Sequence, residues 1–136
     1  MTDGSNTISS TPNRLLVLED EKPIAQRIVG EAESIGVLCR SALTLEDFAR
    51  HYKELDPNLI VLDVVIGSGD ASQAVEFLAK NRSTAAIFVI SGYSTRIAGT
   101  IAGMGRDSGL MIADTINKNA DGIRRLMASI RSYMVR

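Results

Sequence analysis

The apolar positions of this 136-residue chain follow two alternating spacings along its length. Continuous apolar runs are typical of strands that are covered on both faces. They predict strands at Leu15–Leu18, Val37–Cys39, Leu59–Leu62, Ala85–Ile90 and Leu110–Ile116. Apolar residues at helical spacing follow each strand. They predict helices around Ile24–Ile35, Leu45–Tyr52, Ala74–Leu78, Ile97–Met104 and Ile123–Ile130.

Strand–helix alternation with short links favours a parallel sheet with helices on both faces, because each right-handed crossover lays its helix over the sheet. The predicted fold class is therefore α/β, a doubly wound five-stranded parallel sheet in three α/β/α layers. The length fits about one domain, and the chain contains no internal repeat. We expect a flexible N-terminal tail over residues 1–13 and one domain over residues 14–136.

Five polar residues stand where the predicted strands stop. Glu19 and Asp20 follow the first strand, Asp63 the third, Ser91 the fourth and Lys118 the fifth. In open α/β sheets, ligands bind beyond the carboxyl ends of the strands, near the point where the strand order reverses. We therefore expect these side chains to share one pocket, although they are far apart in the sequence.

Each of these residues alone has an ordinary structural explanation, such as an acid near a helix start or a solvated lysine. Together their chemistry is complementary. The carboxylates of Glu19, Asp20 and Asp63 are hard oxygen ligands suited to Mg²⁺. A carboxylate can also attack phosphorus, and the charge of the transferred group then needs compensation. Lys118 would supply that compensation, and Ser91 would donate a hydrogen bond to a phosphoryl oxygen.

Composition and charge narrow the classes of partner. With 45% apolar and 23% charged residues, the chain resembles ordinary globular proteins. A net charge of −1 gives no electrostatic reason to expect nucleic-acid binding. No run approaches the roughly 20 apolar residues that span a bilayer, and the polar start lacks the apolar core of a secretory signal. We expect a cytoplasmic protein with neither nucleic-acid nor membrane partners.

Four segments carry a resemblance to a known family: LLVLEDE at 15–21, PNLIVLDVVIGSGD at 57–70, IFVISGYS at 87–94 and INKN at 116–119. With them, the chain resembles the receiver domain of two-component response regulators, of the CheY-like superfamily. The resemblance covers essentially all of Arg14 to Arg136. The family's acidic pair, phospho-accepting aspartate, switch hydroxyl and lysine fall on Glu19–Asp20, Asp63, Ser91 and Lys118.

The resemblance implies a flavodoxin-like (βα)5 fold. It implies that Asp63 receives a phosphoryl group from a histidine kinase or a histidine phosphotransfer protein, in a reaction that requires Mg²⁺. The implied metal ligands are Glu19, Asp20, Asp63 and the backbone carbonyl of Val65. Such a domain is a signalling switch rather than a conventional enzyme, although it catalyses its own phosphorylation and dephosphorylation. Its output passes to a downstream protein effector, and its fourth helix, fifth strand and fifth helix form a face for homodimer contacts.

Departures from the family pattern leave an alternative open. Asn119 stands where proline usually follows the lysine, and the loop has Ile66-Gly67 where the family usually has Met-Pro. Thr115 stands where many members carry an aromatic residue. A degenerate receiver that acts as a phosphorylation-independent interaction module is the alternative. A phosphohydrolase would need a second acid two residues after its nucleophile, where Val65 stands. A flavin-binding protein on this fold would want a tryptophan and a phosphate-binding loop after the first strand, and both are missing.

Overall fold

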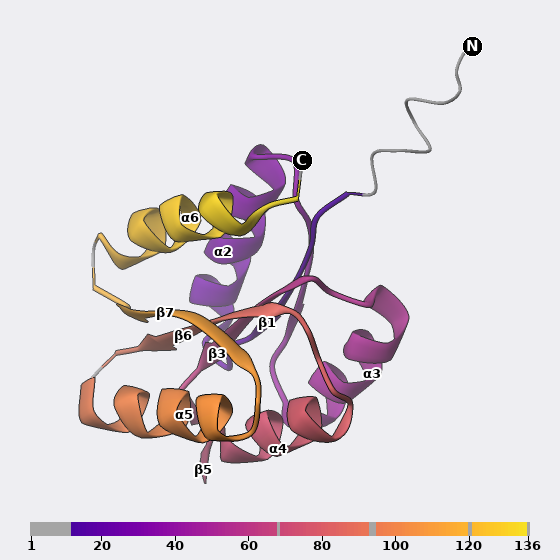
Figure 1. Ribbon diagram of the computed structural model, residues 1–136. Helices are drawn as coiled ribbons and strands as arrows, with labels where there is room; N and C mark the ends of the chain where they lie inside the picture. The colour runs from indigo at the N-terminus through magenta and orange to yellow at the C-terminus, as the bar shows by residue number, and fades with distance from the viewer. Residues whose placement is uncertain (1–11, 68, 93–94, 120, 136) are drawn as a thin grey trace.

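A parallel sheet flanked by helices forms the body of the molecule (Figure 1). The computed structural model describes residues 12–67, 69–92, 95–119 and 121–135. Within them, the main sheet has the order β2-β1-β3-β6-β7, with β1 (Arg14–Leu18), β2 (Leu38–Ala42), β3 (Leu59–Asp63), β6 (Ala86–Ser91) and β7 (Met111–Asn117). The helices are α2 (Lys22–Ser34), α3 (Leu45–Leu55), α4 (Ser72–Lys80), α5 (Thr95–Asp107) and α6 (Gly122–Tyr133).

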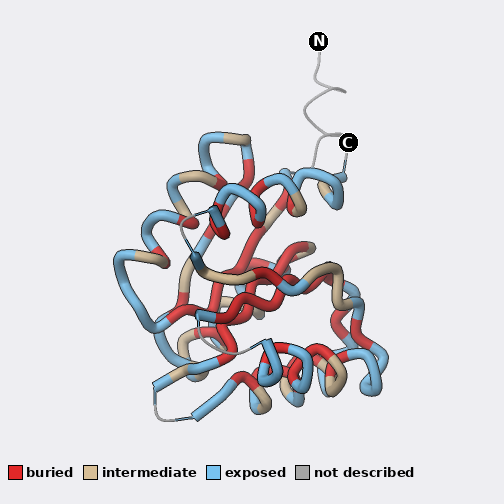
Figure 2. Tube along the Cα trace, turned by 90° about the vertical axis from the view of Figure 1, so that its left-hand side faces the viewer, coloured by how far each residue is buried: buried red, intermediate tan, exposed pale blue. Residues whose placement is uncertain are grey.

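Two hydrophobic cores lie on opposite faces of the sheet. Side chains alternate between the faces along each strand, so Leu15 and Val17 pack with α2 and α6, whereas Leu16 and Leu18 pack with α3, α4 and α5. Figure 1 shows the same division, with α2 and α6 on one side of the sheet and the other three helices on the opposite side. The central strands are therefore buried on both faces, as Figure 2 shows. This double burial explains their continuous apolar runs.

The predicted fold class is confirmed, with corrections at several element ends. The strand predicted at Val37–Cys39 runs instead from Leu38 to Ala42. The strands β6 and β7 extend to Ser91 and Asn117, because their hydrogen-bonded pairing continues after the apolar runs end. Two of the strand-end residues, Asp63 and Ser91, are thus the last residues of their strands rather than the first residues after them.

A small hairpin lies between β3 and α4. Its strands are β4 (Val65–Ile66) and β5 (Gly69–Asp70), which pair in antiparallel fashion. Gly67 in the connecting turn has a φ of 59°, a left-handed conformation that glycine adopts without strain. The sequence pattern missed this hairpin because its strands are only two residues long.

The order of the strands places a crevice between the carboxyl ends of β1 and β3. From β1 the chain passes to β2 on one side, and it then returns to β3 on the other side of β1. The links that leave β1 and β3 therefore diverge, and ligands of open α/β sheets bind where this happens. Glu19 directly follows β1 and Asp63 ends β3, so both carboxylates lie at this point.

Most of the expected N-terminal tail, residues 1–11, lies outside the described residues. Asn13, at the end of that expected tail, is buried. Its Oδ1 accepts hydrogen bonds from Asn58 Nδ2 (2.9 Å) and Val135 N (2.8 Å), which joins the start of β1 to the chain after α6. Within the described part of the chain, no helix is both long enough and apolar enough to cross a membrane.

The turn after Lys118 is closed by Asn119 and by a close backbone approach. Asn119 O accepts a hydrogen bond from Gly122 N (2.9 Å), and Asn119 Oδ1 accepts one from Asp121 N (3.2 Å). The side chain of Asn119 thus closes an Asx-type turn. Gly122 opens α6, and a Cβ at this position would collide with the carbonyl oxygen of Asn117. Glycine is therefore the residue that lets α6 start so close to the end of β7.

We predict that Gly122→Ala lowers the free energy of unfolding by about 1–3 kcal/mol, because a rigid backbone oxygen occupies the space of the added methyl group. Gly99→Ala is the matched control, since its Cβ would meet open space on an exposed part of α5. That change should raise the free energy of unfolding by about 0.5–1 kcal/mol. Urea titrations followed by circular dichroism measure both changes. A Gly122→Ala variant as stable as the wild type would contradict the close approach of Gly122 to the Asn117 carbonyl oxygen.

Candidate functional site

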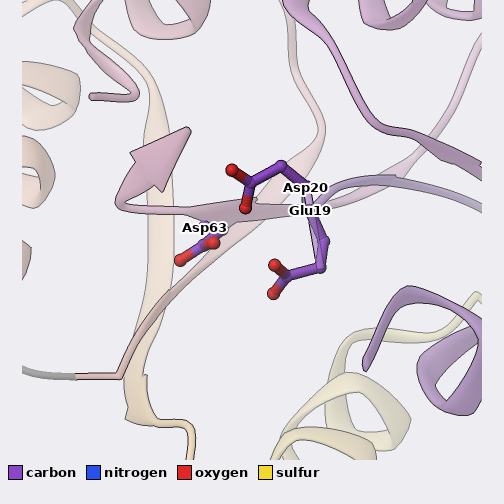
Figure 3. Close-up of side chains that lie close together, drawn as sticks. All are labelled: Glu19, Asp20 and Asp63. Carbon is purple, nitrogen blue, oxygen red and sulfur yellow. The ribbon is translucent and has the colours of Figure 1, made fainter. Parts of the chain in front are cut away.

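Three carboxylates converge at the crevice between β1 and β3. Glu19 and Asp20 lie in the link from β1 to α2, and Asp63 is the last residue of β3. One carboxylate oxygen from each residue lies within 4.8 Å of the other two. Figure 3 shows the side chains reaching toward a common space from two neighbouring segments of the chain. The sequence prediction that these residues gather at one sheet edge is consistent with this geometry.

Lys118 brings a positive charge to this cluster from the end of β7. Its backbone N–H donates to Ser91 O at 2.8 Å, so the register of β6 and β7 fixes where its side chain starts. Its Nζ lies 2.9 Å from Glu19 Oε1, 3.2 Å from Asp63 Oδ2 and 3.5 Å from Glu21 Oε2. The Lys118 side chain is 8% exposed, so these interactions are largely shielded from water.

Burial shifts the protonation equilibria of the site. It raises the pKa of Glu19 to about 7, although the backbone N–H of Glu21 and the Lys118 ammonium oppose this shift. Burial also raises the pKa of Asp63, against opposing effects of Glu19 and Lys118. Burial alone would lower the pKa of Lys118, but the carboxylates of Glu19 and Asp63 outweigh it and raise the pKa to about 12. The lysine therefore stays charged, whereas the carboxylates resist being charged together.

Asp20 differs from the other two carboxylates because it is exposed and is held by the hairpin. Gly67 N donates to Asp20 Oδ2 at 2.7 Å, which ties the turn of the hairpin to the link after β1. The left-handed conformation of Gly67 belongs to the turn that makes this contact. The hairpin is thus part of the site, and sequence reasoning recognised only its residue Val65.

Because of the register of the hairpin, the backbone N–H and C=O groups of Val65 point away from β5. Val65 lies opposite Asp70, and Ala71 N donates to Val64 O at 2.9 Å, next to this pair. The Val65–Asp70 pair is therefore of the non-hydrogen-bonded type. The Val65 N–H interacts with the Asp63 carboxylate and favours its charged form, which lowers its pKa. Val65 also lines a cavity of about 170 Å³ with Asp20, Glu21, Asp63, Gly92 and Lys118.

The donor set of this cavity fits a small hard cation. Mg²⁺ binds oxygen atoms, prefers carboxylates and carbonyls, and usually keeps several water ligands. Glu19, Asp20 and Asp63 supply carboxylates, and Val65 lines the cavity together with Asp20 and Asp63. Glu19 Oε1 is buried and has no hydrogen-bond partner among the described residues, although Lys118 Nζ is 2.9 Å away. A cation would satisfy this oxygen.

Ser91 lies at the edge of this arrangement. It is buried at the end of β6 and lines a second cavity of about 60 Å³ with Thr95, Ala98, Thr115, Ile116 and Asn117. The next residue, Gly92, lines the carboxylate cavity. Thr115 thus lies beside Ser91, in the region where the resemblance leads one to expect an aromatic residue.

Sequence reasoning missed the contribution of Glu21. Its carboxylate is 3.5 Å from Lys118 Nζ, and its backbone N–H donates to Glu19 Oε2 at 3.0 Å. The only signal in the sequence was a third acid in the run Glu19–Asp20–Glu21. That signal is also typical of a helix start, so it could not assign the side chain to the cavity.

The fold matches solved receiver domains. The signal receiver domain of a putative Luxo repressor protein from Vibrio parahaemolyticus has a TM-score of 0.75 at 17% identity, over 90% of each chain. A CheY-like receiver domain protein from Methanospirillum hungatei has a TM-score of 0.76 at 18% identity, over 90% of this chain and 93% of that one. The response regulator TrrA from Thermotoga maritima, in complex with Mg²⁺-BeF, has a TM-score of 0.73 at 16% identity, over 90% and 99%.

No protein-family model matches the chain, and no curated protein matches its sequence. The structural likeness at 16–18% identity shows the fold. It confirms the flavodoxin-like, receiver-type architecture that the sequence pattern and the four segments predicted. The chemistry of the site rests on its own residues.

We predict that Glu19→Gln stabilises the metal-free protein above pH 7. The folded-state pKa of Glu19, about 7, lies above its ordinary value of 4.5, so its contribution to stability is present below pH 4.5 and is lost as the pH rises to about 7. Glutamine avoids this loss. In the presence of a chelator at pH 8, the free energy of unfolding of Glu19→Gln, measured by thermal unfolding, should be about 1–3 kcal/mol higher than that of wild type.

The pH series supplies the control for this prediction. The difference in the free energy of unfolding between Glu19→Gln and wild type should shrink as the pH falls toward 4.5, because Glu19 is then protonated in both the folded and the unfolded chain. A variant that is less stable than wild type at pH 8 would show that ionised Glu19 supports the fold, contrary to this account.

Proposed function

We propose that this chain is a cytoplasmic receiver domain that accepts a phosphoryl group on Asp63 and acts as a signalling switch. The donor is the phosphohistidine of a histidine kinase or of a histidine phosphotransfer protein. One observation carries the proposal: the Asp63 carboxylate lies beside two further carboxylates and 3.2 Å from Lys118 Nζ, and it lines a cavity of about 170 Å³. This combination suits a nucleophile that must hold a transferred anion.

In the proposed reaction, an Asp63 carboxylate oxygen attacks the phosphorus of the phosphohistidine. A P–O bond forms, the P–N bond breaks, and the imidazole nitrogen keeps the electron pair and takes a proton from solvent. Asp63 must be ionised to attack, and burial opposes this by raising its pKa. The positive charge of Lys118 counters burial by favouring the ionised form.

The surrounding residues compensate the charge of the phosphoryl group. Glu19, Asp20, Asp63 and the carbonyl of Val65 would hold Mg²⁺, and the bound cation would supply the positive charge that phosphoryl transfer requires. Lys118 pairs with a phosphoryl oxygen after transfer. Gly92 has no side chain, so it leaves the cavity wall open on the side of β6.

The signal would leave the site through Ser91. Its hydroxyl would donate a hydrogen bond to a phosphoryl oxygen on Asp63, and α5 would shift in response. The proposed output surface consists of α5, β7 and α6, which receives a downstream protein effector or a second copy of the chain. Met111, at the start of the edge strand β7, is exposed on this surface and is available for such contacts.

Intact-mass spectrometry with acetyl phosphate and Mg²⁺ tests the proposal. We expect a phosphoryl adduct on the wild-type chain and none on Asp63→Asn, because the amide is a poor nucleophile. Omission of Mg²⁺ should reduce the adduct strongly. A beryllofluoride titration complements this test, since rapid hydrolysis can hide an adduct. A wild-type chain that forms no adduct and binds neither Mg²⁺ nor beryllofluoride would instead support the phosphorylation-independent interaction module.

We further predict that Ser91→Ala separates phosphorylation from signalling. This variant should still bind Mg²⁺ and beryllofluoride, because Asp63 and Lys118 are intact, but the chemical-shift changes across α5 in amide NMR spectra should be much smaller than in wild type. Ser34→Ala, at the far end of α2, is the control and should behave as wild type. Wild-type shift changes in Ser91→Ala would exclude Ser91 as the sensor.

A further inference from the structure

Glu21 occupies the N-cap position of α2 but does not use its side chain as a cap. Its backbone carbonyl accepts hydrogen bonds from Ile24 N and Ala25 N, both at 3.0 Å, and these bonds start the helix. The side chain makes no capping hydrogen bond. Instead, Oε2 lies 3.5 Å from Lys118 Nζ, on a residue 97 positions away in the sequence. The side chain of Glu21 is thus directed to the cavity rather than to its own helix.

The ammonium group of Lys118 forms ion pairs with three carboxylates. Glu19 and Asp63 are buried and lie at 2.9 Å and 3.2 Å. Glu21 lies farther away, at 3.5 Å, and its side chain is 56% exposed. The ammonium donates hydrogen bonds to Asp63 and Glu21 and forms an ion pair with Glu19, so a phosphoryl oxygen on Asp63 would compete with these carboxylates for it. Of the three carboxylates, Glu21 can give up its contact with Lys118 at the lowest cost in free energy, because water can solvate it.

We propose that Glu21 is a positioning residue that competes with the phosphoryl group for Lys118 and thereby weakens phosphoryl binding. This inference rests on the proposed function. Without a phosphoryl group, Glu21 holds the ammonium at the mouth of the cavity. Once a phosphoryl group is attached, the displaced Glu21 carboxylate still lines the cavity and repels the phosphoryl oxygens. Glu21 therefore sets how long the switch stays on.

The test measures beryllofluoride affinity by calorimetry at saturating Mg²⁺ and low salt. Exposed ion pairs have modest strength, so Glu21→Gln should tighten binding about two- to fivefold. Glu21→Asp keeps the charge but shortens the reach by one methylene group, so its affinity should be intermediate. Glu31→Gln is the matched control, since it removes the same charge from the exposed Arg27–Glu31 pair on α2. It should bind as wild type does.

Two further measurements distinguish positioning from a structural role. Higher salt screens an exposed charge pair, so the difference in affinity between wild type and Glu21→Gln should shrink at 1 M salt. The lifetime of the acetyl-phosphate adduct should increase in Glu21→Gln by a similar factor. If Glu21 acted only in starting α2, Glu21→Gln would instead change the melting temperature, and the beryllofluoride affinity and the lifetime of the adduct would stay unchanged.

The outcomes separate this inference from the proposed function. Wild-type binding of beryllofluoride with equal or weaker binding by Glu21→Gln would overturn the role of Glu21 and leave the receiver function intact. A wild-type chain that neither binds beryllofluoride nor forms an adduct would overturn both.

Discussion

One buried lysine counterbalances a cluster of carboxylates, and the rest of the site depends on this balance. Glu19 and Asp63 are taken out of water at the end of a sheet, where burial favours their neutral forms. Lys118 lies within 3.2 Å of both and remains charged. Such a cluster resists full ionisation unless more positive charge arrives. The proposed affinity for a cation rests on this imbalance of charge.

The fold supplies this balance through the ends of its strands. The switch in strand order brings the ends of β1 and β3 together, which fixes two of the carboxylates. Pairing of β6 with β7 fixes the backbone position from which the Lys118 side chain extends. The turn closed by Asn119 and Gly122 then leads the chain into α6. The two hydrophobic cores hold the strands in register, so packing far from the cavity controls distances inside it.

The sequence predicts the sheet and the strand-end residues because both depend on regular spacing. Continuous apolar runs identify the buried strands, and parallel strands bring their ends to one edge. The hairpin after β3 was not predictable in this way, because its short strands depend on the left-handed turn at Gly67. The contact of Glu21 with Lys118 depends on side-chain direction, which spacing does not specify. Asn119 replaces the expected proline by closing the turn with its own side chain, with a trans peptide bond before it.

A crystal structure grown with Mg²⁺ and beryllofluoride tests the central claim most directly. We expect a metal ion bound by Glu19, Asp20, Asp63 and the Val65 carbonyl, beryllofluoride on an Asp63 oxygen, and Lys118 Nζ paired with a fluorine atom. The contacts between Lys118 and the carboxylates should be reduced in number. A structure obtained at saturating Mg²⁺ and beryllofluoride in which Lys118 keeps all its carboxylate partners and the cavity holds neither group would contradict the account.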